Sequence, residues 1–572
     1  MVSDAACTVG PVAVADETFQ ALADSVVDGF LEREPVAATS LGEHRFDDRL
    51  DDMRPAALDE IRRWLSTSLA ALTAIDPADL SMDNAVDAAI LRAGLEEHTF
   101  MLDELRAHEW DPLIWNPGTA VYLLLARDYA PLPDRLRALT GRLAAIPESL
   151  SVARDTLGAM PRVHIETAIG QFTGTRTMLA TEVERALRQV ESLRPDVESV
   201  RDSAVEALEE HIAWLQDRLA AVRSGAEPER DPRIGAELFR RKLAYTLDAA
   251  TDADAILARA DADLASVSER IREVAARVAG ARPDEPGLVR NVLDQLADEH
   301  PDNDMIVGMA KDTLAATTEF VQSERLATVY DDPVEIIVMP EIHRGVAVAY
   351  CDPPGPLEPA PLPTFYAISP TPSDWPPERV ESFFREYNSH MIHNLTVHEA
   401  MPGHMLQQAH SRRAQPPTKV RAAFGSGPFV EGWAVYAEQL MAAHGYGGGS
   451  VQMQQLKMQL RMIINAILDA RVHASGMPEA DAMALMTEQG FQEEGEAHGK
   501  WRRAQLTSAQ LSTYYVGYTE VNDLVRDLRS ERPDLSTLDL HDTVLAHGSP
   551  APRHLRTLLH LGKPATGPGG RP

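Results

Sequence analysis

The sequence has 572 residues, of which 44% are hydrophobic and 25% charged, proportions that are ordinary for a globular protein. This length exceeds the size at which a single compact core usually stops growing, so we expect two lobes or a few subdomains. The net charge of −33, from 54 basic and 87 acidic residues, argues against nucleic acid or an anionic membrane as a partner, because the electrostatic field has the wrong sign.

The first 15 residues lack the basic and apolar segments of a signal peptide, and we expect residues 1–15 to be disordered. Cys7 and Cys351 are the two cysteines and lie far apart, which does not suggest a disulfide framework. No stretch approaches the roughly 20 apolar residues that a membrane helix needs. The sequence therefore predicts a cytoplasmic protein without a membrane partner, whose oligomeric state it does not determine.

Residues 16–330 show the spacing of helices that are buried on one side. Apolar residues recur at three- and four-residue steps from Phe19 to Phe30, and prolines separate this run from the later ones. Glu and Arg occupy the other faces. The same pattern returns in residues 91–105, 136–146, 197–222, 256–278 and 305–326. These runs predict an N-terminal helical region over residues 16–330.

The pattern changes at about residue 331. Val334–Met339, Val346–Tyr350 and Thr364–Ile368 are short β-prone runs separated by prolines, and they predict a small sheet within residues 334–370. Helical periodicity resumes at Pro377. We expect residues 331–561 to form a second region, comprising this sheet and the helices that carry the motifs described next, and on those motifs we assign it as the catalytic region. The Gly- and Pro-rich residues 562–572 are expected to be a disordered tail.

The stretch V-H-E-A-M-P-G-H ends with a histidine six residues after the first, His398 and His404. In the zinc motif H-E-x-x-H the histidines are four apart and share one helix face. Six steps of about 100° place them roughly 120° apart on a regular helix, too far around the axis for one ion. Pro402 should kink, bulge or end the helix, and Gly403 permits the backbone angles required. Such a break could return His404 to the face of His398.

A zinc site needs a third protein ligand. The helical segment F-V-E-G-W-A-V-Y-A-E carries Glu431 and Glu438 seven residues apart, on one face. The economical interpretation makes Glu431 the ligand and Glu438 a carboxylate that supports a ligand. The alternatives are surface polarity for the His-Glu pair and an amphipathic helix with a solvated acidic edge.

The two motifs H-E-A-M-P-G-H-M-L-Q and E-G-W-A-V-Y-A-E together resemble the bacterial domain-of-unknown-function family 885 over nearly the whole chain. The resemblance implies a mainly α, two-lobed, zincin-like protein similar to gluzincin-type hydrolases. It implies His398, His404 and Glu431 as ligands of one Zn²⁺ per chain and Glu399 as general base. It further implies Tyr514 as a donor to the developing oxyanion. His541 matches a further family position and is a third candidate catalytic residue, without a definite step assigned to it.

The expected function is zinc-dependent hydrolysis of an amide bond, most simply a peptide bond, in a small peptide or amide substrate. By their position, the strands at Val346–Tyr350 or Thr364–Ile368 could pair with an extended substrate backbone. One alternative is a zinc-dependent enzyme that acts on a non-peptide specialised metabolite, and another is an inactive helical scaffold. Many members that this chain resembles look like exported lipoproteins, a feature that its first residues do not share.

Overall fold

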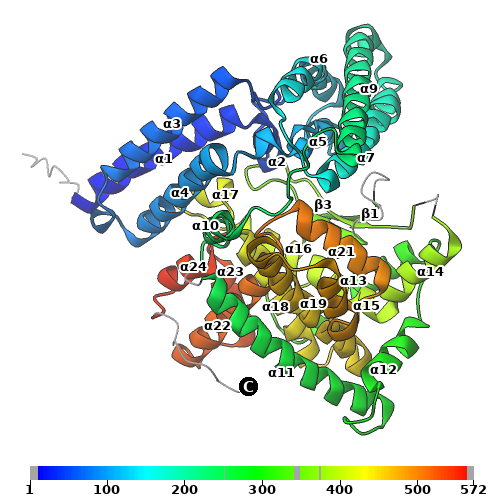
Figure 1. The fold of residues 1–572 in the computed structure, drawn as a ribbon. Helices are drawn as coiled ribbons and strands as arrows, with labels where there is room; N and C mark the ends of the chain where they lie inside the picture. Colours follow the sequence, from blue (N-terminus) through cyan, green and yellow to red (C-terminus); the bar gives the residue numbers. More distant parts are fainter. Residues whose placement is uncertain (1–10, 250–251, 340–347, 373–374, 563–572) are drawn as a thin grey trace, which may run out of the picture.

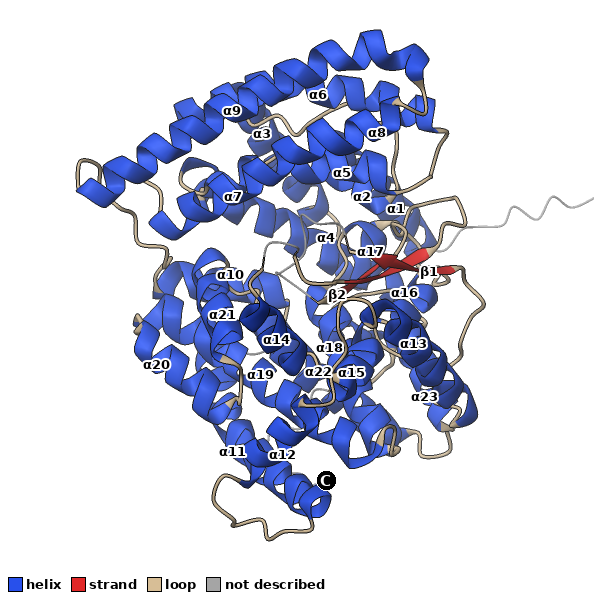
Figure 2. Ribbon diagram, turned by 90° about the vertical axis from the view of Figure 1, so that its right-hand side faces the viewer, coloured by secondary structure: helices blue, strands red, loops and turns tan. Residues whose placement is uncertain are grey.

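The computed structural model describes residues 11–249, 252–339, 348–372 and 375–562, and this part of the chain is mainly helical with one small sheet. The predicted fold class is therefore confirmed. Figure 1 shows α1 to α9 gathered in the upper part of the molecule and most of α11 to α24 in the lower part, with α17 beside α4, and Figure 2 shows the sheet near their boundary. None of the described helices combines the length and apolarity needed to cross a membrane.

The upper part consists of helices from the first 224 residues. They are α1 (Pro11–Arg33), α2 (Pro35–Leu41), α3 (Pro55–Thr73), α4 (Met82–Phe100), α5 (Gly118–Ala126), α6 (Leu132–Thr156), α7 (Arg162–Met178), α8 (Glu184–Leu187) and α9 (Arg194–Ser224), with short 3₁₀ or π turns between several of them. Helix α1 already begins at Pro11, so the expectation of disorder up to residue 15 is wrong for residues 11–15. Residues 1–10 lie outside the described part.

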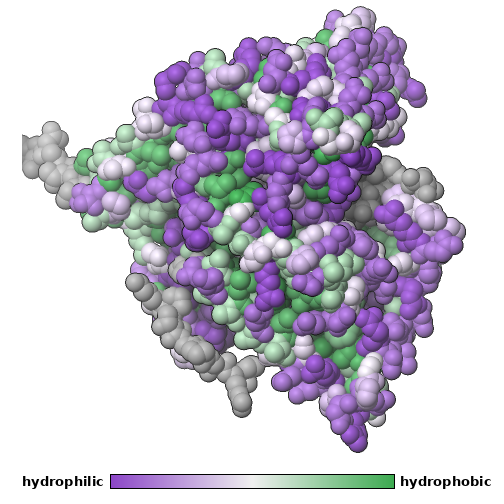
Figure 3. All heavy atoms as spheres, viewed as in Figure 1, coloured by the Kyte–Doolittle hydropathy of each residue, from purple (hydrophilic) through white to green (hydrophobic). Residues whose placement is uncertain are grey.

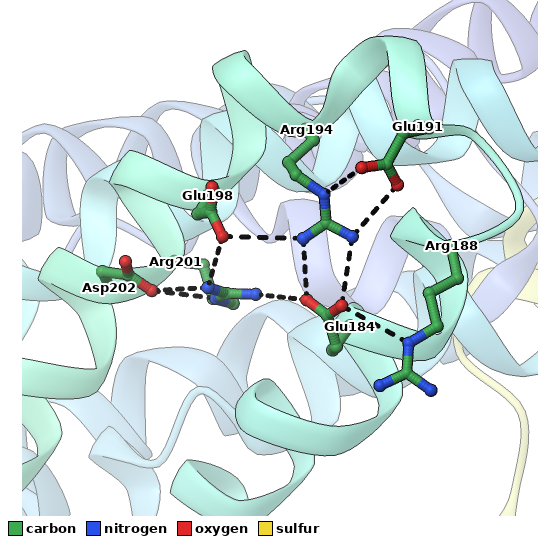
Figure 4. A network of polar contacts seen from close by, with 7 residues as sticks. All are labelled: Glu184, Arg188, Glu191, Arg194, Glu198, Arg201 and Asp202. Atoms are coloured by element: carbon green, nitrogen blue, oxygen red, sulfur yellow. Dashed lines mark hydrogen bonds and ion pairs between the residues drawn. The ribbon is translucent and has the colours of Figure 1, made fainter.

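The upper part contains two apolar cores. One joins α1, α3 and α4 and buries Phe19 and Phe30, as the apolar stripe predicted, and the other joins α5 to α9 around Phe172. Figure 4 shows a network of ion pairs that links α8 to the start of α9 through Glu184 and Arg194. The side chains of Arg194 and Glu184 are 23% and 24% exposed, so solvent screens the network and it contributes less to stability than the cores beneath it.

The remaining helices, most of which form the lower part, are α10 (Ala236–Leu247), α11 (Ala253–Ala279), α12 (Leu288–Ala297), α13 (Ile306–Ser323), α14 (Pro377–Glu386), α15 (Ser389–Glu399), α16 (His404–Ser411), α17 (Val420–Ala423), α18 (Gly427–Ala443), α19 (Gly448–Ser475), α20 (Glu479–Ala484), α21 (Glu494–Leu506), α22 (Ser512–Glu531), α23 (Thr537–Leu545) and α24 (Pro552–Leu558). One of its cores packs α10, α11 and α12 against the long buried helix α19. The other surrounds α15, α16 and α18. Helices α10 to α13 precede residue 330 in sequence but pack with the C-terminal half.

The sheet has three strands, β1 (Val334–Val338), β2 (Ala349–Asp352) and β3 (Thr364–Ile368), in the order β1-β3-β2. Strand β3 runs parallel to β1 and antiparallel to β2. Because β3 is the central strand, the idea that it could pair with a substrate is wrong. Strand β2 is shifted from the predicted range Val346–Tyr350, of which residues 346–347 lie outside the described part. Among the described residues, strand β2 is an edge strand, and it lies next to α15.

The surface agrees with the acidic composition. On the face shown in Figure 3, hydrophilic residues cover most of the exterior, and hydrophobic residues appear mainly in the recessed areas between helices. This is the distribution expected of a well-solvated protein with a net charge of −33.

Candidate metal centre

A helix break accommodates the six-residue histidine spacing. Helix α15 ends at Glu399 and α16 begins at His404, so the predicted interruption at Pro402 and Gly403 is confirmed. The chain folds back between the helices, where the amide of Gly403 donates to the carbonyl of Val397 at 2.9 Å. The two imidazole rings consequently lie face to edge, with 4.8 Å between the centroids of His398 and His404.

The backbone of this break is packed too closely for any residue but glycine at position 403. A Cβ atom added to Gly403 would lie 1.8 Å from the carbonyl oxygen of His398. The buried indole of Trp433 donates from Nε1 to the carbonyl of Pro402 at 2.8 Å. Since Trp433 lies on α18, two residues after Glu431, this bond fixes the break relative to the helix that carries the third candidate ligand.

Three candidate ligand atoms converge at the break. Oε2 of Glu431 lies 3.5 Å from Nε2 of His398 and 3.5 Å from Nε2 of His404. The whole set of ligand atoms lies within 4.8 Å. Zinc–ligand bonds of about 2.0–2.1 Å in a tetrahedron place neighbouring ligands about 3.4 Å apart, close to the spacing here. The side chains of His398 and His404 are each 12% exposed and that of Glu431 is 23% exposed, so solvent reaches the group.

Glu438 determines which nitrogen of His398 is available to a metal. Its Oε1 accepts a hydrogen bond from Nδ1 of His398 at 2.7 Å, and its Oε2 accepts one from Nδ2 of Asn394 at 2.7 Å. The Glu438 side chain is only 2% exposed. A protonated Nδ1 leaves Nε2 as the free lone pair, which is the atom that faces Glu431.

The electrostatics of the group suit a cation. Burial alone would raise the pKa of Glu431, but hydrogen bonding to His398 and His404 outweighs it and holds the pKa well below its usual range. Burial lowers the pKa of His398, and this is more than offset by Glu431 and Glu438, which raise it well above its usual range. Oε2 of Glu431 is buried without a closer polar partner among the described residues. A carboxylate oxygen and two imidazole nitrogens arranged in this way fit a zinc ion.

Glu399 lies next to the ligands as the last residue of α15. Its Oε2 accepts a hydrogen bond from the backbone amide of Cys351 in β2 at 3.0 Å. Burial raises the pKa of the Glu399 carboxyl, and the neighbouring His398 and His404 partly oppose this. The contact with Cys351 orients the carboxylate and brings the edge of the sheet to the metal centre. Sequence reasoning missed this contact, because a backbone amide carries no residue signature.

Tyr514 lies on α22, where that helix crosses α18. A Cβ added to Gly432 would lie 2.2 Å from the carbonyl carbon of Gly517, so the two helices touch backbone to backbone. Tyr514 is three residues, or about one turn, before this crossing. Its hydroxyl accepts a hydrogen bond from Arg503 at 3.2 Å, and among the described residues no direct contact joins it to the ligand group.

His541 is buried behind α18, with 1% exposure, and lies apart from the ligand group. Its Nδ1 donates to the carbonyl of Leu326 at 2.6 Å, and its Nε2 therefore accepts from the hydroxyl of Tyr436 at 2.8 Å. Burial lowers the pKa of His541 to about 4, which keeps the ring neutral near neutral pH. These contacts give it a role in packing α23 against α18.

Fold and site together define a mainly helical protein with a His-His-Glu group that could hold a metal ion. The model of the family described as bacterial protein of unknown function, DUF885, matches residues 35–559, and the chain belongs to this family. The resemblance found from the motifs is thereby confirmed.

Two solved structures share the fold. One, a putative lipoprotein of unknown function from Shewanella oneidensis, has a TM-score of 0.80 and 28% identity over 95% of this chain and 99% of its own. The other, a putative lipoprotein from Colwellia psychrerythraea, has a TM-score of 0.76 and 16% identity over 97% and 100%, and at that identity shows the fold alone. No curated protein matches the chain.

Proposed function

We propose that this protein is a zinc-dependent hydrolase of amide bonds, most simply of peptide bonds. The observation that supports it is the convergence of His398, His404 and Glu431, with Glu399 beside them. Three protein ligands with partial solvent access are typical of a catalytic zinc site, whereas structural zinc sites are closed by four. The helix break between α15 and α16 brings the two histidines to the same position, which a regular helix with this spacing would not do.

In the proposed mechanism, zinc supplies Lewis acidity and lowers the pKa of water. Glu399 takes the proton of the attacking water and returns it to the leaving amine. The Cys351 amide holds the Glu399 carboxylate in place, and Glu438 holds His398. Tyr514 is the candidate donor to the oxyanion that develops on the scissile carbonyl.

The outer edge of β2 offers a place for the substrate backbone. Cys351 directs its amide to Glu399, so this strand meets α15 at the metal centre. An extended peptide can add to such an edge through main-chain hydrogen bonds without a demand on its sequence. This arrangement favours a peptide over a non-peptide metabolite as the substrate.

A second proposal concerns the cellular location of the protein. The similar chains from Shewanella oneidensis and Colwellia psychrerythraea are described as putative lipoproteins. These descriptions favour an envelope location over the cytoplasmic one that the sequence predicts. Cell fractionation decides between the two, because a cytoplasmic pool would contradict the envelope proposal.

The test of the proposed function is digestion of a mixed peptide library with and without a metal chelator. We expect cleavage that the chelator abolishes and added zinc restores. Glu399→Gln should retain zinc and lose activity by about 10²–10⁴-fold, the usual contribution of a general base. Cleavage that is insensitive to chelator, or unchanged in Glu399→Gln, would overturn the proposal. If no library peptide is cleaved by the zinc-loaded protein, the peptide substrate is wrong.

A further inference from the structure

A second group of charged side chains lies outside the metal centre. It consists of Lys457 and Arg461 on α19 together with Lys500 and Arg503 on α21, and we call it the cationic cluster. Lys500 and Arg503 are three residues apart and thus on one face of α21. Four cations packed together are unusual in a chain with a net charge of −33.

Half of the cationic cluster is neutralised by carboxylates. Lys457 donates to Glu386 at 2.9 Å, and both side chains are almost fully buried. Arg461 forms a close ion pair with Glu496 and lies 3.8 Å from Glu386. These two pairs account for the carboxylates that contact the cluster among the described residues.

Lys500 and Arg503 have no such carboxylate. Lys500 is only 6% exposed and makes no hydrogen bond or ion pair with any described residue. Burial, with Arg461 and Arg503 nearby, lowers its pKa well below the ordinary value. Within the described part of the chain, Arg503 donates only to uncharged groups, the Gln510 side-chain oxygen at 2.8 Å and the Tyr514 hydroxyl at 3.2 Å. A buried cation without an anion is costly, so the arrangement fits an anion supplied from outside.

The unpaired cations connect to the metal centre through α22. Arg503 contacts Tyr514, which lies one turn before Gly517 on that helix. Gly517 touches the backbone of Gly432, the residue after Glu431. The path from Arg503 to the candidate zinc ligand thus runs through one side chain and one helix crossing. This chain of contacts places Arg503 on the side of α22 that Tyr514 shares.

We propose that Lys500 and Arg503 form a subsite for a carboxylate of the substrate. This inference rests on the proposed amide hydrolase function, whose substrate class it narrows to amides and short peptides that carry a carboxylate. The carboxylate has two possible sources, the free C-terminus of a peptide and an acidic side chain. Arg503 supplies a planar pair of donors, and a bound carboxylate would favour the charged ammonium form of Lys500, a combination that suits a carboxylate.

The subsite is tested by binding to zinc-loaded Glu399→Gln protein, in which turnover does not interfere. The probes are N-acetyl-Ala-Ala, its C-terminal amide, N-acetyl-Ala-Glu amide and inorganic phosphate, measured by calorimetry. We expect at least one carboxylate peptide to bind tenfold or more tightly than the amide that lacks a carboxylate. Adding Lys500→Met or Arg503→Gln should reduce this preference to less than threefold. The better of the two carboxylate peptides identifies the source.

Arg502→Gln is the matched control, because Arg502 is an exposed cation between the two that contacts only the Thr167 hydroxyl. It should leave the carboxylate preference unchanged. Thermal unfolding checks that Lys500→Met is folded, and removal of an unpaired buried charge should not lower its melting temperature. Equal binding of acids and amide, or a preference that survives in both variants, would overturn the subsite. So would tighter binding of phosphate than of either carboxylate peptide.

The two proposals fail separately. If the zinc-loaded protein cleaves no peptide but Glu399→Gln shows the carboxylate preference, the hydrolase function is wrong and the subsite stands. If peptides with free and amidated C-termini, and with or without acidic side chains, are cleaved at equal rates, the hydrolase function stands and the subsite is wrong.

Discussion

At the scale of single residues, the candidate metal centre depends on protonation as much as on position. Glu438 contacts Nδ1 of His398 and not the nitrogen that faces Glu431, yet it determines that His398 presents Nε2. Asn394 in turn holds Glu438. Partners of this kind usually contribute about 10–100-fold to metal affinity.

Replacing Glu438 by Gln should therefore weaken zinc binding by about 10–100-fold while the fold is retained. A competition titration against a chelator of known affinity measures this. Glu324→Gln is the control, because Glu324 lies 3.6 Å from His444 in another carboxylate–histidine pair, away from the ligands. Zinc affinity within twofold of the parent in Glu438→Gln would show that Glu438 does not support the ligand.

Glu520 predicts a pH dependence of stability away from the metal centre. Burial, with Asp248 nearby, raises its pKa to about 7, and its buried Oε2 has no hydrogen-bond partner among the described residues. The folded state therefore retains a proton that the unfolded state loses above its ordinary pKa of about 4.5. The resulting stability is present at acid pH and is lost as the pH rises from about 4.5 to 7.

Glu520→Gln should remove this loss and stabilise the protein at pH 8 by about 1–3 kcal/mol, with a smaller effect at pH 5. Thermal unfolding at both pH values measures the difference. Glu531→Gln, at an exposed position near the end of the same helix, should have no such effect. An equal effect of Glu520→Gln at pH 5 and pH 8 would contradict the assignment.

At the scale of elements, the break between α15 and α16 forms the site. Gly403→Ala would place a methyl group 1.8 Å from the His398 carbonyl, so the break must open and His404 must move. We expect zinc affinity to fall by at least about 100-fold, since a protein ligand is displaced. Circular dichroism should still report a helical protein, because the helices on either side keep their other contacts.

Gly425→Ala is the control for this change, because an added Cβ there meets its nearest atom at 3.9 Å. It should bind zinc like the parent. If Gly403→Ala also binds zinc with parental affinity, the break does not determine the position of His404.

The close crossing of α18 and α22 also requires a glycine. A Cβ on Gly517 would lie 2.0 Å from the carbonyl oxygen of Pro428, so Gly517→Ala should push the helices apart at a cost of about 1–3 kcal/mol. Thermal unfolding should show a melting temperature lower by several degrees. Gly427→Ala, which meets nothing within 4 Å, should leave it nearly unchanged. Equal melting temperatures of both variants would contradict the close crossing.

The elements show what could be predicted from the sequence. Apolar periodicity located the helices, and the motif spacing around Pro402 predicted the helix break, because both are local effects. The bond from Trp433 to Pro402 and the amide of Cys351 on Glu399 join segments far apart in the chain. They depend on tertiary packing that leaves no local pattern.

At the scale of the whole molecule, helices that are neighbours in the sequence do not always share a hydrophobic core. Helices α10 to α12 continue the helical pattern of the first residues but share a core with α19. Conversely, apolar residues of α17 and Leu558 of α24 pack into the core of α1 to α4. Several segments thus pack across the two parts. The metal centre lies on α15, α16 and α18, which pack in a core of the lower part.

Equilibrium dialysis against buffered zinc tests the central claim most directly. The protein should bind one zinc per chain, and His404→Ala and Glu431→Gln should each bind far less at the same free zinc concentration. Binding of much less than one zinc by the parent, or equal binding by the parent and both variants, would contradict a metal centre formed by His398, His404 and Glu431.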